Sequence, residues 1–494
     1  MLEKTDFLCT IAATETASEE EAQMLRKMNT QLELDFQASS LEITNKYYAR
    51  YEKISEILDQ NPKIKNLVHR DLKKALTGND RYGPGRDSKC ASDTVLRIIV
   101  CMIIEGLSFR KVVIRIDDSK YLRYFVRIYG GQMIGYSRLN TLTNAIRPKT
   151  WKKINRVLAQ AGVEAGLIDG ARLRLDTTAY ETNIHWPTDS GLLWDTYRVH
   201  CRLVNTAREI DPEAASDRRL HPKRVKRLHT KIVRRSAKKQ SVSEEARGLY
   251  NSLIQHVEGL LDWVLVVADR LRKGLAEDAY DLLDAMLAEA VIAQIEHFHA
   301  LGLRVADQAR RRVLDGEKVA NDEKVFSIFE PHTELLKRGK AGKPIEFGHM
   351  IAIQQVENKF ITDYGVFERK PVDYSLVDPA LESHRELFGE NPEELSADKG
   401  FYESMDKIRE LEEEIEVVSI GKKGTRNEEE TERETSTGFK LGQKFRAGVE
   451  GSISFLKRGL GMARCLNKGW EHYVATVGAT VFAHNLLVLA RGYG

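Results

Sequence analysis

Hydrophobic and polar positions follow a helical spacing through the N-terminal third of the chain. Residues up to about Asn61 are polar, with the apolar spacing of a surface or bundle helix. The run from Ser92 to Glu105 is rich in apolar residues and predicts a buried helix with Ser92 as its capping residue. Ser108 and Ser119 are the predicted caps of two further short helices, and Ser137 begins another. The pattern therefore predicts an all-helical N-terminal region.

Short helices joined by brief turns resemble a helix-turn-helix bundle, which is a common DNA-binding unit. In that interpretation the last of these helices presents Arg138 and Asn140 to base edges. A plain helical packing domain accounts for the same pattern equally well, so both interpretations stay open.

The pattern changes to strands at Ala171, where apolar and polar residues alternate up to Asp176. Two further alternating runs, 348–356 and 359–367, are separated by a short polar break and predict a hairpin. A short strand is expected to end at Asp398, and 415–420 reads as a buried strand. The sheet is thus assembled from strands on both sides of a long intervening segment.

That intervening segment is helical and strongly charged from about Tyr197 to Val319. About half of the residues from Arg218 to Lys239 are Lys or Arg, the most basic stretch of the chain. A solvated helix face accounts for this stretch, but we favour contact with DNA phosphates. The cations expected to make such contacts are Arg218, Arg219, Lys223, Arg224, Lys226 and Arg227.

Two C-terminal segments have distinct compositions. The highly charged run 421–438 is predicted to be a mobile loop. The apolar run Tyr473–Ala490 contains His484 and Asn485, which favours a buried helix over a membrane span.

Composition excludes little. A chain of 494 residues is expected to form several domains, and its net charge of +3 gives no argument for nucleic-acid binding. The five cysteines lack zinc-ligand or redox spacing, so reduced thiols are expected. No signal peptide is predicted from the N-terminal residues.

Three acidic residues carry the candidate chemistry. Asp176 and Asp398 are both predicted at strand ends, where ligands bind in α/β sheets. Glu450 lies on a predicted helix with Arg446 one turn before it and Lys457 two turns after it. Three carboxylates surrounded by cations suit divalent metal ions held against a polyanion. Each acid alone has a plain structural explanation, as a turn cap, a loop start or a surface ion pair, but their combination favours a site.

These residues stand in motifs that resemble those of an insertion-sequence DDE transposase, and the resemblance covers roughly Ser92 to the C-terminus. One position departs from the family pattern, because Gln443 stands where a tyrosine usually precedes the arginine by three residues. The motifs are Leu175-Asp176-Thr-Thr with Glu181-Thr-Asn-Ile-His-Trp-Pro-Thr-Asp-Ser190, Ala397-Asp398-Lys-Gly-Phe, and the spaced Arg446, Glu450 and Lys457 followed by Asn485-Leu-Leu.

The resemblance implies an α/β fold with an RNase-H-like mixed sheet, flanking helices, an all-α N-terminal region and an all-α insertion after the first strand. The implied catalytic and metal-binding residues are Asp176, Asp398 and Glu450, with Mg²⁺ as cofactor and Mn²⁺ as a substitute. The domains expected are a DNA-binding or oligomerisation region at 1–170, catalytic segments at 171–198 and 341–494, and a basic helical insertion at 199–340.

The partners implied are transposon terminal inverted repeats and target DNA, bound by a homodimer or higher oligomer in the prokaryotic cytosol or nucleoid, without a membrane. Arg446, Lys457 and Arg458 are expected to contact DNA phosphates. Trp186 is expected to be buried, with stacking on a DNA base as the alternative.

Three other functions are weighed against a transposase. The first is an RNase-H-like nuclease that cuts DNA without joining it, which only a strand-transfer assay separates from a transposase. The second is a DNA-binding regulator without catalysis, which the presence of all three acids disfavours. A purely structural helical scaffold does not explain the strand-terminal aspartates.

Overall fold

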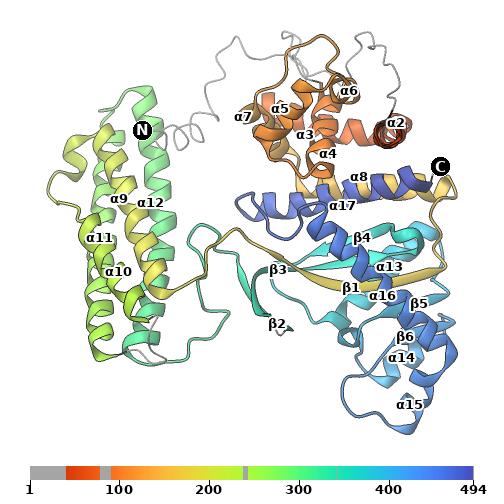
Figure 1. The fold of residues 1–494 in the computed structure, drawn as a ribbon. Coiled ribbons are helices and arrows are strands. Elements are labelled where there is room, and N and C mark those ends of the chain that lie inside the picture. The colour runs from red at the N-terminus through yellow and green to blue at the C-terminus, as the bar shows by residue number, and fades with distance from the viewer. Residues whose placement is uncertain (1–40, 78–90, 237–242, 341, 493–494) are drawn as a thin grey trace. The chain divides into compact units, whose positions relative to one another are not determined.

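The protein is a mixed α/β protein, mostly helical, with a six-stranded mixed sheet and an all-helical N-terminal region (Figure 1). The chain divides into two compact units, one formed by 183–347 and one by the described residues on either side of it. The computed structural model describes residues 41–77, 91–236, 243–340 and 342–492.

The N-terminal region is helical throughout its described part, as predicted. The predicted helix that ends near Asn61 is described from Glu42 onward, and its earlier part lies outside the described residues. The helices are α2 (Glu42–Gln60), α3 (Pro62–Thr77), α4 (Ser92–Ile104), α5 (Phe109–Asp118), α6 (Lys120–Phe125), α7 (Tyr136–Ala145) and α8 (Pro148–Glu164).

Serine caps begin two of these helices, as the sequence predicts. Ser108 accepts a hydrogen bond from the Lys111 amide at the start of α5, and Ser119 does the same from Leu122 at the start of α6. The predicted cap of α4 is wrong, because Ser92 is already helical and its hydroxyl lies 2.9 Å from His69 Nδ1. The side chain is taken by a tertiary contact, so it does not satisfy the helix amides.

The sheet has the strand order β2-β3-β1-β5-β6, and β4 pairs with β3. β3 is antiparallel to both β1 and β4, whereas β5 and β6 continue the sheet parallel to β1. The predicted hairpin is confirmed as β3 and β4, and β2 is a strand that the sequence pattern did not indicate. The strands are β1 (Arg172–Glu181), β2 (Glu334–Lys340), β3 (Lys343–Gln355), β4 (Ile361–Val366), β5 (Glu394–Ala397) and β6 (Val417–Ile420).

β1 does not end at Asp176, so that prediction is wrong. The strand runs on to Glu181, because its other edge stays paired with β3 as far as the partners Glu181 and Gly348. Pairing with β5 stops earlier, at the partners Leu175 and Ala397. Asp176 therefore lies within β1, next to the position where pairing with β5 ends.

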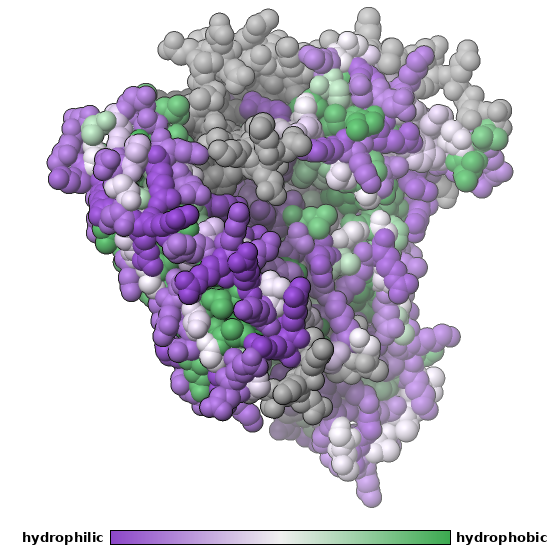
Figure 2. All heavy atoms as spheres, turned by 60° about the vertical axis from the view of Figure 1, so that its left-hand side comes forward, coloured by the Kyte–Doolittle hydropathy of each residue, from purple (hydrophilic) through white to green (hydrophobic). Residues whose placement is uncertain are grey.

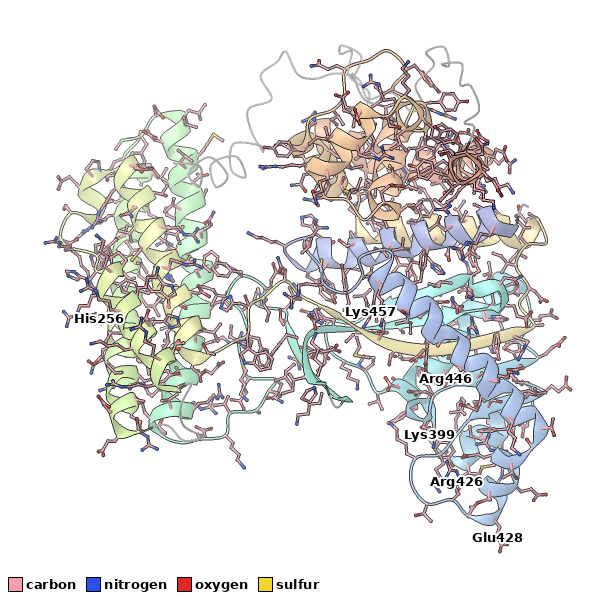
Figure 3. All side chains as sticks on the ribbon, in the orientation of Figure 1. His256, Lys399, Arg426, Glu428, Arg446 and Lys457 are labelled. Carbon is pink, nitrogen blue, oxygen red and sulfur yellow. The ribbon has the colours of Figure 1, made fainter. Side chains whose placement is uncertain are left out.

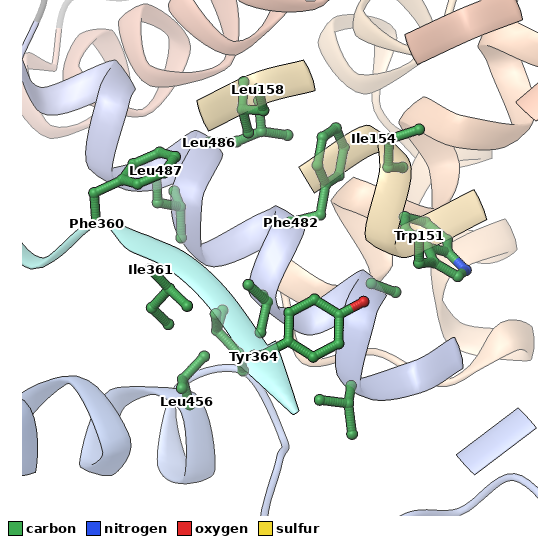
Figure 4. Packing of buried hydrophobic residues seen from close by; sticks show 14 of the residues in the cluster. Trp151, Ile154, Leu158, Phe360, Ile361, Tyr364, Leu456, Phe482, Leu486 and Leu487 are labelled. Carbon is green, nitrogen blue, oxygen red and sulfur yellow. The ribbon is translucent and has the colours of Figure 1, made fainter. Parts of the chain in front are cut away.

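Helices α8 and α17 (Trp470–Gly492) pack together and supply much of the core of the unit that holds most of the sheet. Figure 4 shows Trp151, Ile154 and Leu158 of α8 beside Phe482 and Leu486 of α17, with residues of β4 nearby. By length and hydropathy α17 resembles a membrane span, but 83% of its most apolar window is buried inside the protein. Core packing therefore explains its apolar character, as the sequence predicts.

The remaining helices of this unit follow the hairpin. The short 3-10 helices are η3 (Glu357–Lys359), η4 (Asp373–Leu376) and η5 (Lys399–Phe401). The α-helices are α13 (Val377–Phe388), α14 (Met405–Glu412), α15 (Glu428–Thr435) and α16 (Thr437–Arg458).

The charged run 421–438 is not the predicted loop, because α15 lies within it. Asn427 and Glu430 form a capping box at its start, each side chain bonded to the other residue's backbone amide. Lys422 pairs with the buried Glu430, and Arg426 pairs with Glu434. Specific ion pairs and a helix cap thus order a segment whose composition alone suggests mobility.

The unit formed by 183–347 is mainly a helical bundle with its own hydrophobic core. The segment 199–340 is not all-α as predicted, because β2 lies at its end. Hydrophilic residues cover most of the face of this unit that Figure 2 presents. α9 begins at Asp189, inside the segment that we assigned to the first catalytic part. The elements are α9 (Asp189–Ile210), η1 (Pro212–Ala215), α10 (Pro222–Ser236), α11 (Glu244–Ala276), α12 (Leu282–Ala309) and η2 (Arg310–Leu314), with β2.

Candidate functional site

The sheet register brings Asp176 and Asp398 together. Leu175 of β1 is the partner of Ala397 of β5, and each aspartate is the next residue along its parallel strand. The Asp176 side chain is only 10% exposed, and its Oδ1 accepts a hydrogen bond from the Thr177 amide at 2.7 Å. Asp398 is half-buried, and its Oδ1 accepts from the Gly400 amide at 2.6 Å. Two residues 222 positions apart are thus neighbours at one point of the sheet.

Helix α16 crosses β1, β5 and β6 and carries Glu450 to the same region. Gly442 allows this close packing, since a Cβ there would lie 2.0 Å from the Ser419 hydroxyl oxygen. Gln443 lies on the same helix, one turn before Arg446. Its amide donates to the carbonyls of Ala397 at 3.2 Å and Ser419 at 2.5 Å. Gln443 therefore ties α16 to the ends of both strands, directly beside Asp398.

Arg446 links the helix acid to the strand acid. Its Nη1 donates to Glu450 Oε1 at 3.2 Å, and its Nη2 lies 3.5 Å from Asp176 Oδ2. The Glu450 side chain is 67% exposed, whereas Arg446 is only 21% exposed. Arg446 is therefore a partner of the candidate catalytic acids in this conformation.

The electrostatics of Asp176 reflect the presence of both other acids. The pKa of Asp176 is raised to about 6, mainly by burial, with smaller contributions from the charges of Asp398 and Glu450. The Arg446 guanidinium and the Thr177 amide act in the opposite direction. The elevated pKa marks Asp176 as a carboxylate that gains from a nearby positive charge.

The donor chemistry of the three acids fits Mg²⁺ or Mn²⁺, which prefer oxygen ligands. Within the described parts of the chain, however, no group of three Asp, Glu, His or Cys side chains has the geometry to hold one ion. The sheet places Asp176 and Asp398 side by side. The Glu450 side chain is exposed and forms an ion pair with Arg446. In this conformation the three acids are therefore not arranged around one ion.

Lys457 and Arg458 lie at the C-terminal end of α16, and Figure 3 shows Lys457 along the helix from Arg446. Lys457 is half-buried and Arg458 is exposed. Lys399, on the turn after β5, is a further exposed cation next to Asp398 that the sequence pattern did not single out.

Arg138 and Asn140 lie on α7 and are both exposed, while Leu139 and Leu142 of the same helix are buried. Asn140 accepts a hydrogen bond from the Asn144 side chain at 3.2 Å. α7 packs against α3, α4 and α5. The two side chains therefore occupy the free face of a packed helix, which both the helix-turn-helix and the plain packing interpretations allow.

Helix α10 buries Val225 and Ile232 and exposes its cations. Arg218, which precedes the helix, has a different role from the others. Its guanidinium donates to the Gly259 carbonyl and lies 5.6 Å from the centre of the Trp263 ring. Of the cations predicted to contact DNA here, the exposed ones are Arg219, Lys223, Arg224, Lys226 and Arg227.

Trp186 is 65% exposed, so the prediction of a buried tryptophan is wrong. Its ring meets the edge of Phe347, with the centres 5.2 Å apart, and both line a cavity of about 190 Å³. Stacking on a DNA base stays a prediction.

Asp373 is a residue of this region that the sequence analysis did not identify. Asp373 Oδ1 lies 3.5 Å from the Thr177 hydroxyl, and Thr177 follows Asp176. No motif marks Asp373, because its proximity depends on where the segment after β4 packs.

Comparisons with protein-family models, with curated proteins and with solved structures gave no match. The interpretation of the site therefore depends on its own residues and their arrangement.

Proposed function

We propose that this protein is a DNA transposase that cleaves the ends of its element and joins the freed 3′-hydroxyls to target DNA. The observation that carries the proposal is the convergence of Asp176, Asp398 and Glu450 at the end of the β1–β5 pairing. The sequence motifs around the same three residues support it independently.

The strand order supports an RNase-H-like catalytic domain as the finer description of the fold. Apart from β2, the order is β4-β3-β1-β5-β6, with an antiparallel hairpin on one side of β1 and parallel strands on the other. The bundle enters between β1 and the hairpin, which agrees with an insertion after the first strand.

In this proposal Asp176, Asp398 and Glu450 hold Mg²⁺ or Mn²⁺. Bound ions would supply activation of the attacking hydroxyl and stabilisation of the leaving oxygen in phosphoryl transfer. The chain itself contributes a rigid pair of acids on adjacent strands and a third acid on a helix. Arg446, Lys457 and Arg458 supply positive charge along the same helix for the DNA backbone.

The experiment is an end-cleavage and strand-transfer assay with duplexes taken from the DNA that flanks the gene. We expect cleavage and joining that require Mg²⁺ or Mn²⁺ and are lost in Asp176→Asn, Asp398→Asn and Glu450→Gln. Matched controls are Asp406→Asn, whose side chain is 91% exposed, and Glu428→Gln on the exposed start of α15. These controls should retain activity, because neither residue lies among the three acids.

The pairing of Arg446 with Asp176 and Glu450 favours a second candidate, a DNA-binding regulator in which the arginine permanently neutralises the acids. Specific binding to the flanking DNA without metal-dependent cleavage would support that candidate. Cleavage without joining would instead indicate a nuclease.

A further inference from the structure

Arg174 is a buried cation on β1, two residues before Asp176. Its side chain is only 4% exposed, and among the described residues no carboxylate forms an ion pair with it. Burial lowers the pKa of Arg174 to about 10, and the charge of Arg172 acts in the same direction, whereas Glu357 opposes both. A buried cation held by neutral groups costs stability that an uncharged side chain of similar length does not. Fold stability therefore does not account for an arginine at this position.

The Arg174 guanidinium joins β1 and β3 to helix α16. Its Nε and Nη2 donate to Gln355 Oε1 at 2.9 and 2.5 Å, and Gln355 is the partner of Arg174 in the β1–β3 pairing. Its Nη1 donates to the Phe445 carbonyl of α16 at 2.7 Å, and the guanidinium lies 4.6 Å from the centre of the Phe445 ring. One planar group thus fixes two strands and a helix in a single geometry.

Gly448 makes room for this guanidinium. It lies on α16, three residues after Phe445, and a Cβ there would be 2.4 Å from Arg174 Nη1. The backbone of α16 therefore approaches β1 most closely where Arg174 holds it, and any larger residue at this position would displace the guanidinium.

The contacts of Arg174 are next to those of the candidate catalytic acids. Side chains alternate along a strand, so Arg174 and Asp176 lie on the same face of β1. On α16, Phe445 accepts from Arg174, and the following residue, Arg446, pairs with Asp176 at 3.5 Å and with Glu450 at 3.2 Å. Neighbouring residues of the helix thus contact alternate residues of the strand. The hold of Arg174 on Phe445 sets where Arg446 and Glu450 stand relative to Asp176.

We propose that Arg174 is a positioning residue, whose hydrogen bonds hold α16 at the place and rotation that bring Glu450 to the region of Asp176 and Asp398. This inference rests on the proposed function, because it names a residue on which the same reaction depends. Arg174 acts through the helix and has no part in binding DNA.

The test substitutes Arg174→Met, which keeps the length of the side chain and removes its charge and donors. We expect kcat for end cleavage to fall about 100-fold, since a shift of about 1 Å at reacting groups has this effect. KM for the DNA should stay within about twofold, and the free energy of unfolding should be unchanged or higher. Ser452 still donates to Gln355 Oε1 at 3.2 Å, so the variant leaves that acceptor satisfied. An unchanged kcat, or a fall explained by the unfolded fraction, would overturn the proposal.

Arg172→Met is the matched control. Arg172 also stacks on Phe445, with 4.1 Å to the ring centre, but it is half-buried and pairs with Glu394 at 2.8 Å and Glu357 at 3.0 Å. Its replacement should lower the free energy of unfolding, because two carboxylates lose their partner, and should leave kcat within about threefold. An equal fall in kcat in both variants would show that the effect is not specific to Arg174.

Gly448→Ala tests the same contact without removing the charge. Alanine favours a helix more than glycine does, so this variant should fold, and its methyl group should displace the guanidinium and lower kcat. In the double variant with Arg174→Met the methyl group should have little further effect on kcat, because no guanidinium is left to displace. Fully additive losses would overturn the proposal.

Crystal structures of the wild type and Arg174→Met distinguish failure of this inference from failure of the proposed function. We expect α16 to move by about 1 Å relative to β1 in the variant, taking Arg446 out of reach of Asp176. If the wild type neither cuts nor joins DNA, the transposase proposal falls, and a displaced α16 still supports the positioning role. An undisplaced α16 overturns that role whether or not the wild type is active.

Discussion

The guanidinium of Arg446 lies 3.5 Å from the carboxylate of Asp176, although the two residues are 270 positions apart. The same guanidinium holds Glu450 at 3.2 Å. A cation in this position competes with a metal ion for the two acids. In this arrangement the buried Nε of Arg446 has no hydrogen-bond partner among the described residues.

Arg446→Ala should therefore raise the Mn²⁺ affinity of the DNA-free protein by about three- to tenfold, because a competing charge is removed. DNA-end cleavage should fall in the same variant, since a phosphate contact is lost. Arg446→Lys, which keeps the charge, is the control and should bind Mn²⁺ much as the wild type does. Calorimetric titration with Mn²⁺ measures the first effect. A fall in affinity would mean that Arg446 orients the acids for the metal.

Asp176→Asn should stabilise the metal-free protein above pH 6 by about 1–3 kcal/mol. Burial raises the folded-state pKa of Asp176 to about 6, so its protonated form is favoured in the folded protein. The stabilising contribution of protonated Asp176 is complete below the unfolded pKa of about 4 and is lost as pH rises through 6. The advantage of the variant should accordingly shrink as pH falls from 7 to 4. Denaturation of both proteins in the presence of a chelator measures this difference in stability. A variant less stable than the wild type at pH 7.5 would contradict the prediction.

Three buried histidines should make the fold sensitive to acid. Burial lowers the pKa values of His200, His384 and His484 to about 4. Because these pKa values lie below those of the unfolded chain, stability is complete above about pH 6.5 and is lost as pH falls toward 4. His384→Gln should reduce proton uptake on unfolding near pH 5 by about one. His297 is exposed, so His297→Gln is the control. An equal reduction in proton uptake in both variants would exclude the burial of His384 as the cause.

The exposed face of α10 should bind DNA by charge. Replacing Lys223, Arg224, Lys226 and Arg227 with Gln should weaken binding to all sequences alike and flatten its dependence on salt by about one unit per lost phosphate contact. Arg272 and Arg311 pair with acids in the structure, so their replacement serves as the control. Fluorescence anisotropy over a series of salt concentrations measures the slope. An unchanged slope would indicate that α10 is a solvated surface helix that does not contact DNA phosphates.

The exposed face of α7 should read sequence if the N-terminal helices bind DNA as a helix-turn-helix. Arg138→Ala and Asn140→Ala should each reduce discrimination between element ends and random DNA by about 1–3 kcal/mol. Lys149→Ala, at an exposed position of α8, should leave discrimination unchanged. Competition binding with end and random duplexes measures the difference. Equal weakening on both duplexes would indicate phosphate contacts in place of base reading.

Local patterns determined most of the elements. Hydrophobic spacing predicts the helices of the N-terminal region and of the bundle, and strand alternation predicts the hairpin, because both periods follow from backbone geometry. Side-chain caps at Ser108 and Ser119 were predicted for the same reason, since a cap needs only residues a few positions apart. The approximate positions of Asp176, Asp398 and Glu450 in these elements were likewise set by local sequence.

Tertiary packing decided what local patterns do not encode. The length of β1 depends on its partners β3 and β5, and the order of α15 depends on ion pairs such as Arg426 with Glu434. The exposure of Trp186 depends on the packing of its loop. The pairing of Arg446 with Asp176 and the approach of Asp373 to the turn at Gly400 join segments that are far apart in the chain. The sequence by itself thus indicated the candidate site residues Asp176, Asp398 and Glu450. Only the folded chain decided which charges face each other, because electrostatic interaction depends on distance in space.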